Sequence, residues 1–248
     1  MTTAISRRFT EHAPIGKRIV NLARDHAAAV EGRPLFSWRT STEDPKPLKP
    51  GNYQRKIGSH VGKGAWSGFP IYCLTLPERT TCPRSCGHWL DCYGNKMNWA
   101  KRHAPGERLE FALRAQIAAL AAKHPDGFVV RLHILGDFYS VEYVEMWAAL
   151  MARYPMLRVF GYTARDPNEA IGEALGLIEH RHRWRWAVRY SNGDPDVVWA
   201  HARTVSIDTA EDCPPDAIVC PAQTDKTDCC GTCALCWTTH LAIAFLRH

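Results

Sequence analysis

The chain has 248 residues, of which 46% are hydrophobic and 23% are charged, so it is long enough for one large domain and too apolar for a wholly disordered protein. No apolar run approaches the roughly 20 residues that span a bilayer, and the N-terminal stretch has arginines without the apolar core of a secretory signal, so we expect a cytoplasmic protein that does not contact membranes. The net charge of +6 suits an anionic ligand or nucleic acid, and it is equally compatible with an ordinary basic protein.

Three regions are expected along the chain. Residues 1–68 form an irregular lead-in, in which 14–32 predict a short helix that ends at Gly32 and the following stretch is rich in proline, glycine and lysine. Residues 69–212 carry a regular alternation of strand and helix patterns, and residues 213–248 form a cysteine-rich C-terminal segment. We expect these regions to correspond to a lead-in, a core and a metal-cluster segment.

The core alternates between short apolar strands and amphipathic helices. Strands are expected at 70–77, 127–138, 157–165, 183–191 and 202–208, and helices from near Asp91 or Asn95, at 106–124, at 140–154 with Ser140 as N-cap, and at 166–180. This alternation predicts an α/β fold with a parallel sheet, either an open doubly wound sheet or a partial or full (β/α) barrel. The stretch 180–189 mixes arginines with tryptophans, so it favours a strand and leaves single-stranded nucleic-acid binding as an alternative.

Polar residues follow four successive strands, at the ends where ligands gather in both architectures. The first exit carries the cysteine loop. The others carry Gly136 and Asp137, then Tyr162, Thr163 and Arg165, then Tyr190, Ser191 and Asn192. We therefore expect a shared rim that binds a ligand, with arginine suited to a carboxylate or phosphate.

The first cysteine group lies in the stretch "TCPRSCGHWLDCYGNK". Cys82, Cys86 and Cys92 are spaced C-x3-C-x5-C, and ten cysteines in a cytosolic chain indicate metal or redox chemistry rather than disulfides. Three thiolates on one loop suit a [4Fe–4S] cluster with one open iron. The alternative is zinc, with His88 or Cys73 as a fourth ligand, although Cys73 falls within a strand where a buried thiol is expected.

The second group lies in "CPAQTDKTDCCGTCALCW". Cys230, Cys233 and Cys236 form C-x2-C-x2-C, the run typical of ferredoxin-type clusters, and Cys220 is the expected fourth ligand. Cys229 competes with Cys230, and zinc is again the alternative metal. Four thiolates without an open position indicate a structural or electron-transfer site.

These segments together resemble a bacteriophage and prophage family known as gene product eighty-eight, over roughly residues 65–240. The motifs that carry the resemblance are the cysteine loop, the stretch "RLHILGDFYSVEYVEMWAALMARYPMLRVFGYTAR" and the C-terminal cysteine run, in that order. The resemblance implies a phage or mobile-element origin, and hence the host cytoplasm.

More distantly, the layout resembles radical S-adenosylmethionine (radical SAM) enzymes, which are partial (β/α) barrels with a three-cysteine loop after the first strand. This resemblance implies that Cys82, Cys86 and Cys92 hold the cluster whose open iron binds S-adenosylmethionine. It also implies that Gly136 and Asp137 hold the cofactor amine. The aromatic residue that packs near the adenine in those enzymes precedes the third cysteine, where this chain has Asp91, and Tyr93 stands on the other side of Cys92. The C-terminal cysteines then correspond to an auxiliary cluster.

Two candidate residues keep simpler alternatives. Asp137 is either a partner of a cationic amine or a loop carboxylate before the next helix. His133, if it alternates strictly with its neighbours Leu132 and Ile134, points away from the helices and is either a core histidine or a ligand contact.

Two functions follow from different classes. The first is an iron–sulfur enzyme that cleaves S-adenosylmethionine reductively, with an electron donor as partner and a nucleotide or nucleic acid as the expected substrate class. The second is a non-catalytic nucleic-acid-binding protein whose loops are held by zinc or iron–sulfur sites.

Overall fold

The computed structural model of the protein describes residues 40–90, 92–97 and 100–247. The helix expected within 14–32 therefore lies outside the described residues. Across the part of the chain that is described, no helix combines the length and the apolar character needed to span a bilayer.

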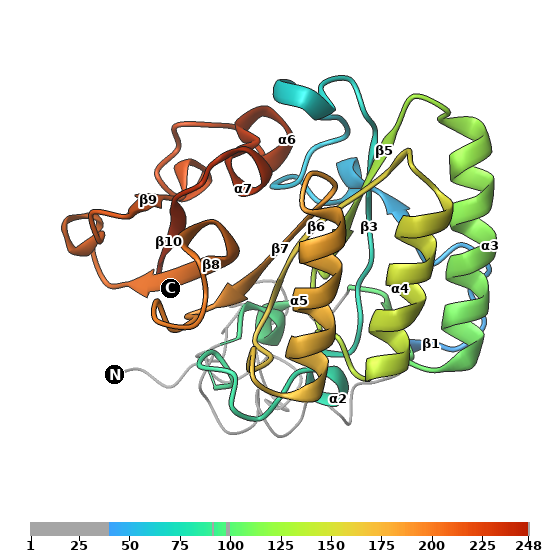
Figure 1. Ribbon diagram of the computed structural model, residues 1–248, viewed down its shortest axis with the longest axis horizontal. Coiled ribbons are helices and arrows are strands. Elements are labelled where there is room, and N and C mark those ends of the chain that lie inside the picture. The colour runs from blue at the N-terminus through green and yellow to red at the C-terminus, as the bar shows by residue number, and fades with distance from the viewer. Residues whose placement is uncertain (1–39, 91, 98–99, 248) are drawn as a thin grey trace, which may run out of the picture.

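One mixed sheet of eight strands organises the fold (Figure 1). Its order is β2-β3-β5-β6-β7-β8-β10-β9, and every neighbouring pair is parallel except β2 with β3. The strands are β2 (Lys49–Pro50), β3 (Ile71–Cys73), β5 (Phe128–Leu132), β6 (Leu157–Thr163), β7 (Trp186–Ser191), β8 (Arg203–Ile207), β9 (Ala217–Val219) and β10 (Ala242–Leu246). A separate parallel pair joins β1 (Thr40–Ser41) to β4 (Arg102–His103).

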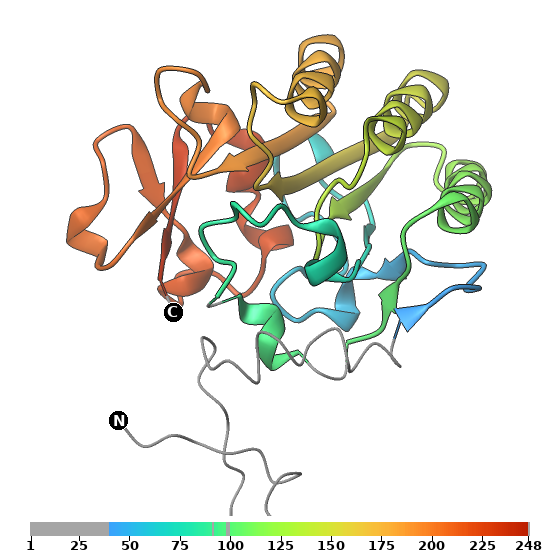
Figure 2. The ribbon, with the colours of Figure 1, turned by 90° about the horizontal axis from the view of Figure 1, so that it is seen from below.

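Three long helices cover one face of the sheet and lie side by side in Figure 2. They are α3 (Glu107–Lys123), α4 (Val141–Arg153) and α5 (Ala170–His182). Their apolar stripes and the strand side chains that point toward them form the larger core, in which Phe128, Trp147 and Leu157 have no exposed surface. Ser140 caps α4 by accepting a hydrogen bond from the Tyr143 amide at 3.2 Å, as expected.

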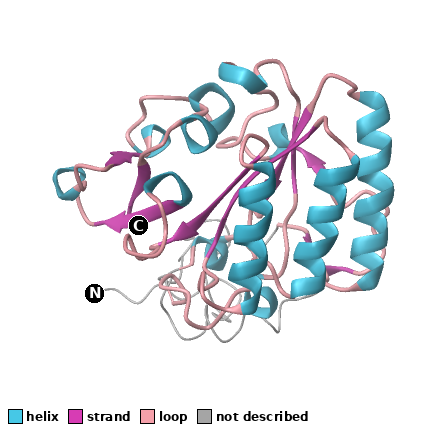
Figure 3. Ribbon diagram, viewed as in Figure 1, coloured by secondary structure: helices cyan, strands magenta, loops and turns pink. Residues whose placement is uncertain are grey.

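The opposite face of the sheet carries a second core, built largely by residues from both ends of the described chain. Short helices α6 (Cys230–Cys233) and α7 (Leu235–Thr238) pack there, as Figure 3 shows on the side away from the long helices. Trp237 stacks on Trp66 with ring centroids 5.3 Å apart and also contacts Phe160 at 4.6 Å. The C-terminal segment is thus packed directly onto the sheet, and it supplies strands β9 and β10 as well.

Short helical turns complete the described chain. They are the α-helix α2 (Glu78–Thr81) and the 3-10 helices η3 (Gly51–Tyr53), η4 (Gly64–Trp66), η5 (Tyr93–Lys96), η6 (Ala200–Ala202), η7 (Ala210–Asp212) and η8 (Pro221–Gln223).

The strand–helix alternation expected of the core is confirmed, and two details differ. The expected α-helix near Asp91 or Asn95 is wrong, because η5 is a single 3-10 turn. An added Cβ at Gly94 would lie 2.8 Å from the Glu78 carboxylate, so this turn packs tightly against Glu78. In the stretch 180–189 the strand starts only at Trp186, which is buried, while Trp184 is 82% exposed.

Candidate metal centres

The first cysteine group lies on the loop that leaves β3. Cys82 ends helix α2, and its amide donates to the Glu78 carbonyl at 3.0 Å. Cys82, Cys86 and Cys92 are close enough for each thiol to affect the other two electrostatically, and burial raises the pKa of Cys82 and of Cys92. The structure thus brings together the three cysteines predicted from the spacing.

A buried ion pair fixes the shape of this loop. Arg102 donates to both carboxylate oxygens of Glu78, at 2.7 and 2.9 Å, and both side chains are nearly inaccessible. The same guanidinium donates to the carbonyls of Met97 and Ala100, so it joins the start of the loop to its end. This role is not visible in the sequence, because Glu78 and Arg102 are 24 residues apart.

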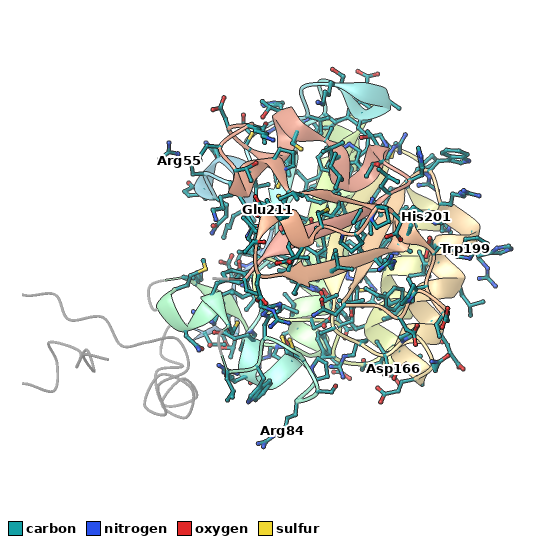
Figure 4. The ribbon with its side chains drawn as sticks, turned by 90° about the vertical axis from the view of Figure 1, so that its left-hand side faces the viewer. Arg55, Arg84, Asp166, Trp199, His201 and Glu211 are labelled. Carbon is teal, nitrogen blue, oxygen red and sulfur yellow. The ribbon has the colours of Figure 1, made fainter. Side chains whose placement is uncertain are left out.

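A second arginine, Arg79, holds the middle of the loop. It donates to the Trp89 carbonyl and to the Asn95 side chain, and its guanidinium lies 4.6 Å from the Trp89 ring centroid. Arg84 lies 5.8 Å from the same ring and projects away from the body of the protein in Figure 4. The exposed side of the cysteine loop is therefore cationic and aromatic.

The loop crosses the carboxyl ends of the neighbouring strands. His88 Nε2 lies 3.0 Å from the Ser206 hydroxyl on β8, and a Cβ at Gly87 would lie 3.5 Å from the Asn192 amide nitrogen at the end of β7. Asn192 in turn accepts a hydrogen bond from the Ser206 amide at 2.7 Å. The cysteine loop and the exits of β7 and β8 thus form one continuous rim.

The exit of β5 meets the same loop through Gly136 and Asp137. Gly136 has φ of +83°, and an added Cβ would lie 2.6 Å from both the Leu76 Cβ and the Thr81 Oγ1, so only glycine fits without displacement. The Asp137 amide donates to that Thr81 hydroxyl at 3.1 Å.

Asp137 is a buried carboxylate with several internal donors. The amides of Phe138 and Ala164 and the hydroxyl of Thr163 each donate to it at 2.7 Å. Burial raises its pKa to about 6 despite these hydrogen bonds, which act in the opposite direction. The carboxylate therefore joins the exits of β5 and β6, which corresponds to the loop-carboxylate alternative, and it also lies near Cys82.

The remaining rim candidates take different positions. Arg165 donates to the carbonyls of Phe138 at 2.7 Å and Thr81 at 2.6 Å, so its side chain ties two strand exits to the cysteine loop. Ser191 is half-buried at the end of β7. Tyr93 is 44% exposed, yet its hydroxyl end is surrounded by protein, and burial raises its pKa.

The expected orientation of His133 is wrong. Its Nε2 lies 3.0 Å from the Tyr143 hydroxyl on α4, and its ring packs against Phe138, so it faces the helices. The strand ends at Leu132, and the strict alternation of side chains ends with it. Tyr190, another rim candidate, also faces the helices, where its hydroxyl donates to the Gly172 carbonyl at 2.8 Å.

The second cysteine group lies on the opposite side of the sheet from the long helices. Cys220 precedes η8, Cys230 and Cys233 lie on α6, and Cys236 lies on α7. Each of these four thiols affects all three others electrostatically, and burial raises the pKa of Cys220, Cys230 and Cys236. The structure thus brings together the four cysteines predicted for this group.

The other cysteines have different surroundings. Cys229 is the N-cap of α6, where its sulfur lies 3.5 Å from the Thr232 hydroxyl and would lie 2.5 Å from a Cβ at Gly58. Cys73 is buried in β3, and burial raises its pKa to about 12. Cys213 lies beside the Pro214 carbonyl.

Polar side chains from the sheet reach the second group. The Tyr162 hydroxyl lies 2.8 Å from the Cys236 sulfur, and Arg189 Nε donates to the Cys236 carbonyl at 2.9 Å. Arg189 also donates to the carbonyls of Thr239 and Leu241, so it fixes the chain that follows α7. Neither residue could be assigned from sequence, because a strand pattern does not say what packs on its second face.

The cysteines of each group lie near one another without forming a site for a single ion. Among the described residues, no three side chains of histidine, cysteine, aspartate or glutamate are arranged to hold one metal ion. Thiols nonetheless match the ligands of both zinc and iron–sulfur sites. A four-iron cluster also spreads its cysteine ligands farther apart than a single ion does. The donor sets therefore match the ligands of such a cluster in their chemistry.

The comparison with known proteins bears on the same residues. The family model described as gene product 88 matches residues 48–239, a range that includes both cysteine groups. The chain belongs to this family. The gene product 88 membership expected from the sequence is thereby confirmed. No curated protein and no solved structure matches the chain.

Proposed function

We propose that this gene product 88 protein is an iron–sulfur enzyme that acts on S-adenosylmethionine in the manner of radical SAM enzymes. Cys82, Cys86 and Cys92 would hold a [4Fe–4S] cluster with one open iron, and the four C-terminal cysteines would hold a second cluster. The proposal rests chiefly on one observation, the mutual proximity of three thiols at the carboxyl ends of parallel strands.

The surroundings of the first group support an open iron. Glu78 is engaged by Arg102, and Asp137 accepts three hydrogen bonds, so the two carboxylates that affect Cys82 electrostatically already have partners. His88 is engaged with Ser206. Within the described residues, the neighbouring side chains that could complete the ligand set are therefore committed elsewhere, which favours a small molecule at the fourth corner.

The arrangement of the strands supports the same class of fold. The consecutive order of β3, β5, β6, β7 and β8, with helices on one face, is what we expect of a partial (β/α) barrel. Residues near the rim would then position the cofactor: Tyr93 beside the adenine, Gly136 and Asp137 near the amine, and Thr163, Arg165, Ser191 and Asn192 around the remaining polar groups.

The loaded first cluster would supply an electron for the reductive cleavage of S-adenosylmethionine. The chain's own contribution is to hold the loop by Glu78 and Arg102, and to shield the site with the Trp89 ring. The exposed guanidinium of Arg84 supports a phosphate-bearing substrate such as a nucleotide or nucleic acid (Figure 4). An external electron donor is required.

Anaerobic purification tests the proposal. We expect a brown protein that contains iron and sulfide, and that forms 5′-deoxyadenosine from S-adenosylmethionine after reduction. Cys86→Ala should lose this product and only part of the iron, because the second group remains. Colourless protein with tightly bound zinc, or no product from an iron-loaded wild type, would contradict the enzyme assignment.

One observation favours a second candidate, a nucleic-acid-binding protein whose loops are stabilised by zinc or iron–sulfur sites. Arg79 and Arg84 flank the Trp89 ring on the exposed loop, and alternating cations and aromatic rings are typical of single-strand binding. Fluorescence anisotropy with a labelled single strand tests it. Binding that weakens with salt and with Arg84→Ala, without product formation, would support this candidate over the enzyme.

A further inference from the structure

Arg131 is a buried cation for which the described chain provides no carboxylate partner. It lies on β5 beside Cys73 and Phe160, on the face of the sheet that carries the second cysteine group, and it is 7% exposed. One terminal nitrogen donates to the Leu132 carbonyl at 2.7 Å, and Nε has no hydrogen-bond partner. Among the ion pairs of the described residues, none involves Arg131.

A charge in this position needs compensation. Burying a guanidinium without an anion costs several kcal/mol, so a nearby negative charge is expected in the functional protein. Arg189 is the other buried arginine on this face, and it differs from Arg131 because carbonyl oxygens surround its guanidinium. Of these two arginines, Arg131 is the one whose guanidinium is not surrounded by carbonyl oxygens.

The second cysteine group is a source of negative charge on this face of the sheet. The Arg131 guanidinium lies 4.6 Å from the Tyr162 ring centroid, and the Tyr162 hydroxyl lies 2.8 Å from the Cys236 sulfur. Cys230 and Cys236 both lie within electrostatic range of Arg131. When four thiolates bind a zinc ion or an iron–sulfur core, their negative charge exceeds the positive charge of the metal, so the loaded group is an anion.

We propose that Arg131 is the counter-cation of the loaded second cysteine group, acting together with the hydroxyl of Tyr162. The inference builds on the proposed function in that it takes these four cysteines as metal ligands, but it does not depend on which metal they hold. With iron, a nearby positive charge and a hydrogen bond to sulfur favour the more negative reduced state, and both raise the reduction potential. With either metal, the cation stabilises the thiolates against release.

The decisive comparison is Arg131→Met with Arg131→Lys. Methionine keeps an unbranched side chain over the Tyr162 ring and removes the charge, whereas lysine keeps the charge. Arg158→Met is the matched control, because Arg158 also lies over an aromatic ring, Phe69, but on the neighbouring strand and toward its start. Circular dichroism melts of the full chain establish that each variant folds.

With iron bound, an anaerobic redox titration followed by electron paramagnetic resonance gives the potential of each cluster. We expect Arg131→Met to weaken reduction of the second cluster at least tenfold, which is about 59 mV for a one-electron couple. The first cluster, Arg131→Lys and Arg158→Met should remain near the wild-type values. A second-cluster potential in Arg131→Met equal to that in Arg158→Met would overturn the inference.

Metal retention separates this inference from the enzyme assignment. If the wild type holds zinc, the proposed function fails, and release to a chromophoric chelator then tests Arg131. We expect at least tenfold faster release from Arg131→Met, with Arg131→Lys restoring retention. Equal release rates for wild type and Arg131→Met, or a wild-type chain whose second group retains neither metal, would overturn the role of Arg131.

Discussion

Neutralising Glu78 should destabilise the protein strongly, because it leaves the Arg102 guanidinium buried without its anion. The two side chains form a two-point ion pair at 2.7 and 2.9 Å, with 3% and 7% of their side-chain surfaces exposed. Removing one partner of such a pair costs about 3–5 kcal/mol, most of which is the penalty of the remaining buried charge. We therefore expect Glu78→Gln to lower the free energy of unfolding by at least about 3 kcal/mol.

Urea unfolding followed by tryptophan fluorescence measures this loss. With a slope of about 3 kcal/mol per molar urea, the upper end of the usual range, the midpoint should fall by about 1 M or more. The double variant Glu78→Gln with Arg102→Met should cost less than the sum of the single variants, because no unpaired charge then remains. The amount of metal bound at the first cysteine group should decrease together with the free energy of unfolding, since the Glu78–Arg102 pair joins both ends of the cysteine loop.

The exposed pair of Glu43 and Arg108 provides the control. It has the same 2.7 Å separation, but both side chains are 76% exposed, so Glu43→Gln should leave the urea midpoint nearly unchanged. A loss below about 1 kcal/mol in Glu78→Gln, or equal losses in the two variants, would refute the reasoning that burial makes this pair important.

Three further predictions concern other parts of the site. Gly136→Ala should lower the melting temperature, because the positive φ and the close contacts of Gly136 leave no room for a methyl group. Gly176 lies on α5 with open space around it, so Gly176→Ala should raise the free energy of unfolding by about 0.5–1 kcal/mol. Equal effects of the two substitutions would contradict this reasoning. The raised pKa of Asp137 means that the folded state binds the Asp137 proton more tightly than the unfolded state does. As the pH rises from about 4 to about 6, the free energy of unfolding of the wild type should therefore fall relative to that of Asp137→Asn, by up to about 3 kcal/mol in urea titrations. Parallel pH profiles for the two proteins would contradict this. Cys230→Ala should lose metal from the second group while Cys229→Ala retains it, as measured by elemental analysis, and the reverse result would exchange their roles.

The sequence predicted the parts of the fold that depend on local patterns. Helix α4 has a serine cap and an apolar stripe, and the parallel strands carry continuous apolar runs, so both can be recognised without tertiary information. Cysteine spacing predicted Cys230, Cys233 and Cys236 as ligands, but it left Cys229 as an alternative to Cys230. In the structure, the Cys230 thiol lies within electrostatic range of Cys220, Cys233 and Cys236, whereas Cys229 caps helix α6.

The missed features depend on contacts between distant segments. The ion pair of Arg102 and Glu78 joins residues that are 24 positions apart, so no local pattern indicates it. His133 faces the helices because the strand stops one residue earlier, and the boundaries of short strands are poorly marked in sequence. Strand β10 was missed because its five apolar residues follow the cysteine segment, where no alternation of strands and helices draws attention to them.

The position of β10 has a consequence for biosynthesis. This strand follows β8 and β9 in the chain, yet in the sheet it lies between them. During translation, β9 cannot add to the sheet until Ala242–Leu246 have left the ribosome and β10 has inserted beside it. Chains that stop before β10 is complete should therefore leave the border of β8 uncovered, so a stop just before Ala242 would be expected to damage the sheet as severely as one far upstream.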